Sequence, residues 1–337
     1  MINVILYSRE DCHLCDQARQ YLEELHAEIP HNLTVIDVDG NADLRRAYGF
    51  EVPVVEIGPY KLKAPINQQE LRITLLAARD RNEQLEEINR QRYASTQARR
   101  QSWTTTDKFT YWLGRHYLGL FNIFVLLYVG LPVLAPVLMR GGMEAPARLI
   151  YKIYGGVCHQ LAFRSFFIFG EQSVYPREIA GLRGIQTFNQ ATGLSEEVSA
   201  EAQFAARKFL GDEAVGYKIA LCQRDVSIYA AILLFGLLYA VSGRRTPAIP
   251  WYIWVLVGLV PIGLDGTSQL LSQPPFSIYA LRESTPLLRV VTGGLFGFTT
   301  AWFGYPMVEQ TMAETRQIMA AKLIRLQKSA SLRRAAN

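Results

Sequence analysis

The apolar runs are short in the first part of this sequence and long in the second. Residues 1–86 show short apolar runs separated by amphipathic stretches, which is typical of strands and helices around one soluble core. Beyond residue 116 the apolar runs are longer and uncharged, as in the 23 residues Tyr117–Met139. A run of that length can cross a hydrocarbon layer about 30 Å thick as one helix. The pattern predicts a soluble α/β part followed by a helical membrane part.

Residues 1–86 are expected to form one domain in which strands and helices alternate. Three strands are predicted at Ile2–Ser8, Leu33–Val38 and from Val52, and three helices at Asp16–Ala27, Ala42–Tyr48 and from Asn67 through Leu85. A further strand before the last helix completes the order β-α-β-α-β-β-α. This order is that of a thioredoxin-type α/β domain.

The chemistry of this domain is concentrated in Cys12 and Cys15, which lie at the start of the first predicted helix. Two intervening residues place both sulfurs within one helical turn. Unpaired N–H groups and the helix dipole favour a thiolate at a helix N-terminus, where the pKa of a thiol falls from about 8.5 into the range of about 3.5–7.5. We therefore expect Cys12 to attack a disulfide and Cys15, which is more buried, to resolve the mixed disulfide.

Four neighbouring residues are expected to support this pair. Arg9 adds positive charge, and a protonated His13 stabilises the Cys12 thiolate. A cis peptide bond between Val52 and Pro53 would place backbone groups beside the sulfurs, where they can pair with an extended thiol substrate. Half of a zinc site is the alternative for the cysteines.

This domain resembles the glutaredoxin-like branch of the thioredoxin superfamily over about residues 1–85. The matching motifs are Leu6-Tyr7-Ser8, Cys12-His13-Leu14-Cys15, Asp37-Val38-Asp39, Tyr48-Gly49 and Val52-Pro53-Val54. The chain departs from typical glutaredoxins at His13-Leu14, where they carry Pro-Tyr. The resemblance implies a redox-active cysteine pair whose partners are thiol or disulfide proteins or glutathione. Glutathione is the candidate thiol donor, and no other cofactor is implied.

The membrane part, residues 117–308, is predicted to contain four spans in contact with the lipid bilayer. They are Tyr117–Met139, Val226–Ser242, Trp251–Leu271 and Val290–Val308. Ala145–Phe169 is also apolar but is interrupted by four basic residues. We interpret it as an interfacial or re-entrant helix, with a fifth span as the alternative. Four spans put both termini on one side, and the basic residues beside the spans place that side in the cytoplasm. The expected location is the inner or plasma membrane.

Composition excludes several classes of protein. Only 19% of the 337 residues are charged, below the roughly 25% of soluble domains, which argues against a single soluble enzyme. Four cysteines are too few for a disulfide-stapled secreted scaffold, and no cleavable signal is expected at Met1. The net charge of +5 comes from residues beside the spans and in the tail, without an aromatic-interleaved basic patch. A nucleic-acid partner is therefore not expected.

Three further segments lie outside the predicted spans. Residues 87–116 are expected to form a basic helical linker, and residues 170–218 an extracytoplasmic insert. Within the insert a helix is predicted at Ser195–Leu210, with Ser195 as its N-cap. Residues 309–337 form a basic amphipathic cytoplasmic tail, which we expect to lie on the membrane surface rather than to pack as a partner helix.

Polar side chains gather on the outer side of the predicted membrane domain. They are Cys158, His159, Gln160, Arg164, Cys222, Arg224, Asp225, Asp265, Gln269, Arg282, Glu283 and Arg289. Asp265 lies 14 residues after Trp251, or roughly 21 Å along a helix. An ionisable group at that depth is costly unless it is paired, which makes Asp265 a candidate functional residue. Its expected partner is Arg164, Arg282 or Arg289.

These motifs resemble an uncharacterised bacterial and archaeal membrane-domain family over about residues 115–308. The matching residues are Cys158-His159-Gln160, Cys222-Gln223-Arg224, Ile228-Tyr229, Leu264-Asp265-Gly266, Gln269 and Arg282–Thr285. Members of the family carry a second clustered cysteine where this chain has Asp225, and this chain has a long insert. The resemblance implies no particular activity.

Three interpretations of the polar cluster stay open. Cys158 and Cys222 could form a disulfide on an oxidising face. Zinc could bind to a set of four residues, Cys158, His159, Cys222 and Asp225. Adjacent Cys and His ligands on one ion are strained, so a metal is not the first expectation. Finally, the cysteines could be small buried apolar residues, with the charged groups forming an ion network that holds the helices together.

The sequence favours a membrane-tethered thiol-disulfide oxidoreductase that uses a cytoplasmic Cys-x-x-Cys. Two other classes stay open. One is a non-enzymatic accessory or assembly subunit that docks on other membrane subunits through its soluble domain. The other is a transporter or lipid-acting membrane protein centred on Asp265.

Overall fold

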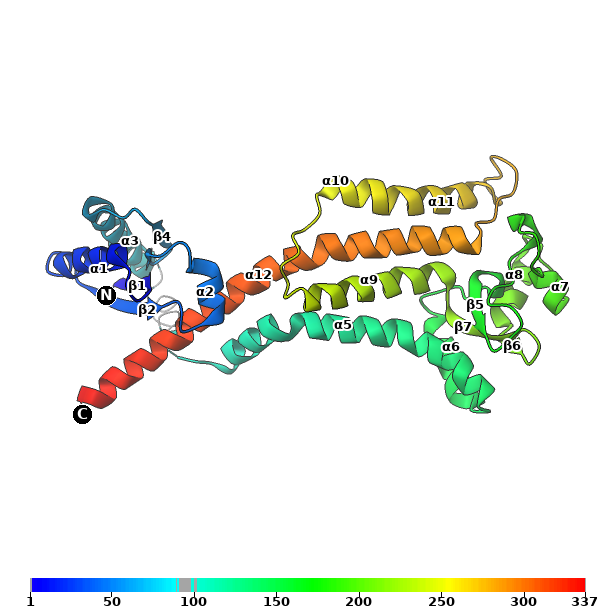
Figure 1. Ribbon diagram of the computed structural model, residues 1–337, viewed down its shortest axis with the longest axis horizontal. Helices are drawn as coiled ribbons and strands as arrows, with labels where there is room; N and C mark the ends of the chain where they lie inside the picture. The colour runs from blue at the N-terminus through cyan, green and yellow to red at the C-terminus, as the bar shows by residue number, and fades with distance from the viewer. Residues whose placement is uncertain (1, 89, 91–97, 100–101, 337) are drawn as a thin grey trace. The chain divides into compact units, whose positions relative to one another are not determined.

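The computed structural model describes residues 2–88, 90, 98–99 and 102–336 (Figure 1). The predicted linker 87–116 falls partly outside the described residues. The chain forms two compact units, each described by itself below. One contains residues 1–116 together with 310–337, and the other contains residues 117–309.

The first unit is built on a four-stranded sheet of order β2-β1-β3-β4. Its elements are β1 (Ile2–Ser8), α1 (His13–Leu25), β2 (His31–Asp37), α2 (Ala42–Tyr48), β3 (Val54–Ile57), β4 (Tyr60–Lys63) and α3 (Gln68–Ile88). β1 pairs with β2 in parallel and with β3 in antiparallel orientation, and β4 pairs antiparallel with β3. This arrangement confirms the predicted thioredoxin-like α/β fold.

Strand β1 is an inner strand of the sheet, and both of its faces are buried in apolar cores. Val4 and Leu6 contribute to one core, together with apolar residues of α1 and α3. Ile5 and Tyr7 contribute to a second core, which also contains Leu44 of α2. Successive side chains of a strand point to opposite faces, so the sheet needs a helical cover on both sides.

The second core is completed by the C-terminal helix α12 (Pro286–Ala336). Ala320 and Ala321 are 1% and 4% exposed in this core. The Arg316 Nε donates to Asp43 Oδ1 of α2 at 3.0 Å. The expectation that the tail lies on the membrane surface is therefore wrong for these residues. Helical spacing identified an apolar face, but spacing does not reveal which surface covers that face.

Three described helices are long and apolar enough to cross a membrane. They are α5 (Thr105–Arg140), α9 (Gln223–Val241) and the continuous stretch Trp251–Leu271, in which α10 (Trp251–Ile253) and α11 (Val260–Leu271) flank a π-helical turn. The fourth predicted span, Val290–Val308, lies within α12 and is not among these three. The number of spans stays a prediction.

Helix α12 approaches α9 closely at two glycines. A Cβ atom at Gly297 would lie 2.1 Å from the Ile228 carbonyl oxygen, and one at Gly293 would lie 2.8 Å from the Arg224 carbonyl oxygen. The four-residue spacing puts both glycines on one face of α12, as in the small-residue interfaces of membrane helices. This packing holds the first turn of α9 against the start of α12.

The segment Ala145–Phe169 is helical only in its first part. Helix α6 (Glu144–Tyr154) ends at the C-cap Gly155. A 3-10 turn at Ala162–Arg164 and strand β5 (Ser165–Ile168) follow. A single interfacial or re-entrant helix over the whole segment is therefore wrong. The apolar run was misread because a four-residue strand is too short to show a clear period of two.

The rest of the insert contains the predicted helix as α8 (Ala200–Lys208), together with elements that the sequence did not predict. They are α7 (Phe188–Thr192), β6 (Gly211–Asp212) and β7 (Gly216–Cys222). The sheet order is β5-β7-β6, with both pairs antiparallel. Ser199, rather than Ser195, caps α8 by accepting from the Ala202 N–H. The predicted helix Ser195–Leu210 therefore began one turn too early.

The packing of α12 on the sheet can be tested with Ala320→Asp, which places a carboxylate in a fully buried position. We expect the free energy of unfolding of the first unit to fall by at least about 2 kcal/mol, because the buried charge has no partner. Ala330→Asp, at an exposed position of the same helix, is the matched control. Urea unfolding of the full-length protein in detergent would be monitored by proteolysis of the N-terminal domain. The urea midpoints of the two variants would then be compared with that of the wild type. Equal midpoints would contradict the packing.

Candidate functional site

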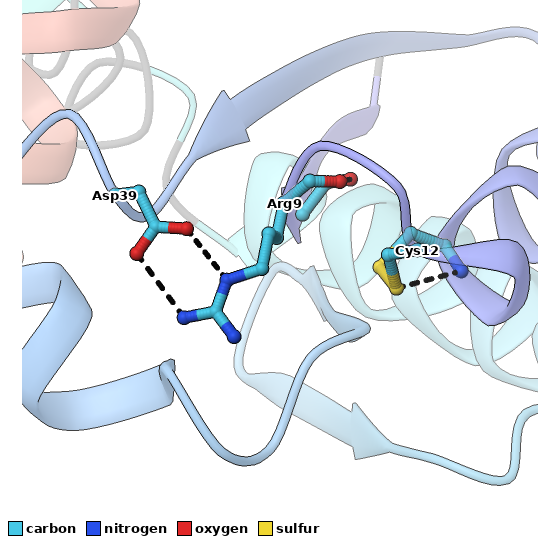
Figure 2. The surroundings of a disulfide bond; sticks show 5 residues. Arg9, Cys12 and Asp39 are labelled. Atoms are coloured by element: carbon cyan, nitrogen blue, oxygen red, sulfur yellow. Dashed lines mark hydrogen bonds and ion pairs between the residues drawn. A yellow bond between two sulfur atoms is a disulfide. The ribbon is translucent and has the colours of Figure 1, made fainter.

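Cys12 and Cys15 form a disulfide at the N-terminus of α1, with an S–S distance of 2.04 Å (Figure 2). Cys12 is the N-cap of the helix, and its sulfur accepts from the Cys15 N–H at 3.3 Å. Asp11, with φ of 55°, lies in the left-handed region just before the helix. The sharp turn there directs the chain from the end of β1 into α1.

The two sulfurs differ in access to solvent. Cys12 is half-buried, whereas Cys15 is 1% exposed and packs among the apolar residues of the domain. His13 and Leu14 between them are both exposed, Leu14 by 48%. An incoming disulfide can therefore reach the sulfur of Cys12 more readily than that of Cys15, and it meets an apolar side chain beside the pair.

Arg9 is paired with Asp39 rather than left free beside the cysteines. Its Nε and Nη2 donate to the two carboxylate oxygens at 2.5 and 3.1 Å, and Figure 2 shows the guanidinium directed at Asp39. The hydrogen bond from Arg9 holds the pKa of Asp39 below its ordinary value. The positive charge expected near Cys12 is thus partly neutralised at neutral pH.

The Val52–Pro53 peptide bond is cis, as predicted. Val52 is half-buried, and Pro53 is buried directly before β3.

In the second unit, Asp265 of α11 is 4% exposed and has three donors. Arg282 Nη2 donates to Oδ1 at 2.9 Å, and the Ser284 hydroxyl donates to Oδ2 at 2.8 Å. Arg224 Nη2, from the first turn of α9, also donates to Oδ2. Arg282 was one of the expected partners, and Arg224 was in the predicted cluster. The burial of Asp265 is accounted for by these contacts.

Glu283 is the second buried carboxylate of this unit and also binds three arginines. Arg164 donates to both of its oxygens, at 2.8 and 2.9 Å, and Arg177 donates at 3.4 Å. Arg289 donates to Glu283 and, at 3.3 Å, to Gln269. Burial raises the pKa of Glu283, but the Arg164 hydrogen bonds and the arginine charges outweigh burial and hold it below its ordinary value. Arg164 and Arg289 therefore pair with Glu283 and not with Asp265.

Cys158, Cys222 and Asp225 form a separate group at the start of α9. One sulfur or carboxylate oxygen from each lies within 4.8 Å of the others. The hydrogen bond between the thiols lowers the pKa of Cys158 and raises that of Cys222. Both are free cysteines. His159 is exposed and is not part of this group, so the structure brings together three of the four residues considered for zinc.

Sequence reasoning missed two buried basic residues of this unit. Lys218 of β7 donates to the Gln160 and Arg207 carbonyl oxygens at 2.8 and 2.7 Å, and burial lowers its pKa to about 7. A lysine inside the apolar run of β7 was a signal that could have found it. Arg177 lies in a polar stretch of the insert, where nothing in the sequence distinguishes it from a solvated arginine.

Comparisons with known proteins assign the two parts of the chain separately. Residues 3–79 match the model of a glutaredoxin-like domain (DUF836). Residues 213–303 match the model of a family described as predicted membrane protein (DUF2085).

Two individual proteins are similar to parts of the chain. An uncharacterized protein of Methanocaldococcus jannaschii is 27% identical over 161 residues, which are 47% of this chain and 67% of that protein. A structural genomics target protein from X. campestris, solved by X-ray methods, is 37% identical. That match covers 22% of this chain and 96% of the other, with a TM-score of 0.20. By the two family models, the chain joins an N-terminal glutaredoxin-like domain to a C-terminal domain of the predicted membrane protein family.

Proposed function

We propose that this protein is a membrane-tethered thiol-disulfide oxidoreductase whose reactive pair is Cys12 and Cys15. The observation that carries the proposal is the position of Cys12 as the N-cap of α1, with the Cys15 N–H donating to its sulfur. Donors and the helix dipole at this place stabilise a thiolate, which is the attacking species in disulfide exchange. The membrane helices hold this chemistry at the bilayer.

The proposed reaction transfers two electrons from the reduced pair to a substrate disulfide. The Cys12 thiolate attacks one substrate sulfur, and the other substrate sulfur leaves as a thiolate that takes up a proton. The Cys15 thiolate then attacks the Cys12 sulfur, which forms the intramolecular disulfide and releases the second substrate thiol. A thiol donor, for which glutathione is the candidate, returns the two electrons and restores both cysteines.

The orientation of the protein in the membrane is part of the proposal. Four spans with both termini in the cytoplasm would place Cys12 and Cys15 in a reducing compartment, where a dithiol is maintained. Cys158 and Cys222 would then lie on or near the outer face. An accessory role without redox turnover is the alternative class, and it predicts that the two N-terminal thiols are dispensable.

Substitution of the two N-terminal cysteines separates these possibilities. We expect Cys12→Ser to lower reduction of a small disulfide by at least about 1,000-fold, because the attacking sulfur is removed. Cys15→Ser should accumulate a mixed disulfide on Cys12, which intact mass would detect. Gln20→Ser, an exposed change on the same helix, should behave as wild type. Turnover by Cys12→Ser at the wild-type rate would exclude the proposed chemistry.

We expect the Arg9–Asp39 pair to influence the reactivity of Cys12, in a way that depends on whether Asp39 is ionised. Because the folded-state pKa of Asp39 is lowered, its pairing with Arg9 is complete above the ordinary carboxyl pKa and is lost as the pH falls through the folded value. Asp39→Asn removes the neutralising carboxylate at all pH values. We expect alkylation of reduced Cys12 at about pH 6 to become about twofold faster, and less so at high salt. Arg9→Gln should slow it, and unchanged rates in both variants would refute the effect.

Asp265 can be tested as a structural or a functional residue. Asp265→Asn leaves Arg224 and Arg282 without their carboxylate, so we expect the full-length protein to lose about 3 kcal/mol of unfolding free energy. Disulfide reduction at Cys12 should be unaffected under conditions where the variant is folded. Thermal unfolding in detergent and the reductase assay measure the two effects. Unchanged stability would reopen a transport or lipid-acting role for this carboxylate.

A further inference from the structure

The group formed by Cys158, Cys222 and Asp225 lies outside the site proposed for disulfide exchange. Cys158 follows the end of α6, while Cys222 closes β7 and is the N-cap of α9. Asp225 lies in the first turn of α9. Two segments of the second unit, the turn after α6 and the junction of β7 with α9, therefore bring two sulfurs and one carboxylate oxygen within 4.8 Å of one another.

The Cys158 side of this group is held in place by Gln160. The Gln160 backbone is in the left-handed region, with φ of 52°, and its side chain is 4% exposed. Its Nε2 donates to the carbonyl oxygens of Tyr151 and Ala220, each at 2.9 Å. Lys218 donates to the Gln160 carbonyl oxygen at 2.8 Å. These bonds tie the turn after α6 to β7, so the distance between the two cysteines is fixed by the fold and not by their own side chains.

Backbone N–H groups interact with both sulfurs. The N–H groups of Gln160 and Cys222 face the Cys158 sulfur, and the Asp225 N–H faces the Cys222 sulfur. Hydrogen bonds of this kind orient ligand atoms and support their charged forms in metal sites.

The carboxylate is the feature that a simple cysteine pair does not explain. Two sulfurs and a carboxylate oxygen are a ligand set suited to a thiophilic cation, and an ion lying between them would contact all three. A disulfide would remove the charge on both sulfurs and leave Asp225 with no role in the group. A divalent cation uses all three.

We propose that Cys158, Cys222 and Asp225 bind one thiophilic divalent cation, with Zn²⁺ as the expected ion. Zinc accepts sulfur ligands at about 2.3 Å and carboxylate oxygens at about 2.0–2.2 Å, so tetrahedral ligand atoms lie about 3.5–3.8 Å apart. The three observed atoms, within 4.8 Å of one another, are close enough to approach one ion together. Three protein ligands leave the fourth position to water or an exogenous ligand, which is the arrangement of zinc sites that react. His159, exposed and outside the group, is not required.

Metal binding can be measured on the full-length chain with Cys12 and Cys15 both replaced by Ser. This background removes the other thiols of the sequence, so failure of the proposed reductase activity cannot affect the result. Reduced protein is titrated with Co²⁺ without oxygen. We expect one equivalent to bind, with a sulfur-to-cobalt charge-transfer band and tetrahedral visible bands that Zn²⁺ abolishes. Asp225→Asn should weaken Co²⁺ binding at least about tenfold. Glu213→Gln, an exposed change in the same insert, should leave the affinity unchanged.

Two results would overturn the proposal. If the reduced protein presents two titratable thiols and gives no cobalt spectrum, the group is packing without a metal. If both thiols become labelled only after reduction, and the protein releases no zinc on denaturation, the pair is a disulfide. The cobalt titration of the protein with Cys12 and Cys15 replaced by Ser is decisive by itself. The proposal is therefore tested even if Asp225→Asn fails to fold.

Discussion

The placement of a sulfur at the N-terminus of α1 is the feature on which the redox chemistry depends. β1 is held between β2 and β3, and Asp11 turns the chain from the end of this strand into the helix, so that Cys12 becomes the N-cap. The Cys15 N–H of the first turn then donates to the attacking sulfur, while the Cys15 side chain is buried. The geometry of this helix end thus gives the two cysteines different properties. Cys12 is accessible to a substrate, whereas Cys15 is buried behind it.

A thioredoxin-like sheet has two faces, and in this chain the second face is covered from a distant part of the sequence. The Arg316–Asp43 pair joins residues 273 positions apart, beside the buried Ala320 and Ala321. The small alanine side chains let α12 lie close to the sheet, where a larger residue would hold it away. Completion of this core requires the C-terminal residues, so the core depends on contacts of very high sequence separation.

Local patterns predicted the elements of the N-terminal domain, but not the cover that α12 gives to its second core. The order of the elements, the cysteine pair and the cis bond before Pro53 could be predicted, because alternation, a helix start and an X-Pro bond are encoded by adjacent residues. The partners of the polar residues in the membrane half were only partly predictable. Arg282 meets Asp265 as expected, whereas Glu283 takes Arg164, Arg289 and the unforeseen Arg177. Which arginine pairs with which carboxylate depends on the tertiary structure, and local sequence patterns do not reveal it. The same holds for His159, which lies outside the group of Cys158, Cys222 and Asp225.

The most direct test of the redox role is the equilibrium of the Cys12–Cys15 pair in the full-length protein, set against a series of thiol-disulfide buffers. The reduced fraction would be read by alkylation and peptide mass. A reversible transition that exchanges two electrons, with equal values approached from the oxidised and the reduced side, is expected for an exchanging dithiol at a helix N-terminus. A pair that stays oxidised in the strongest reducing buffer until the protein is unfolded would contradict a catalytic role for these cysteines.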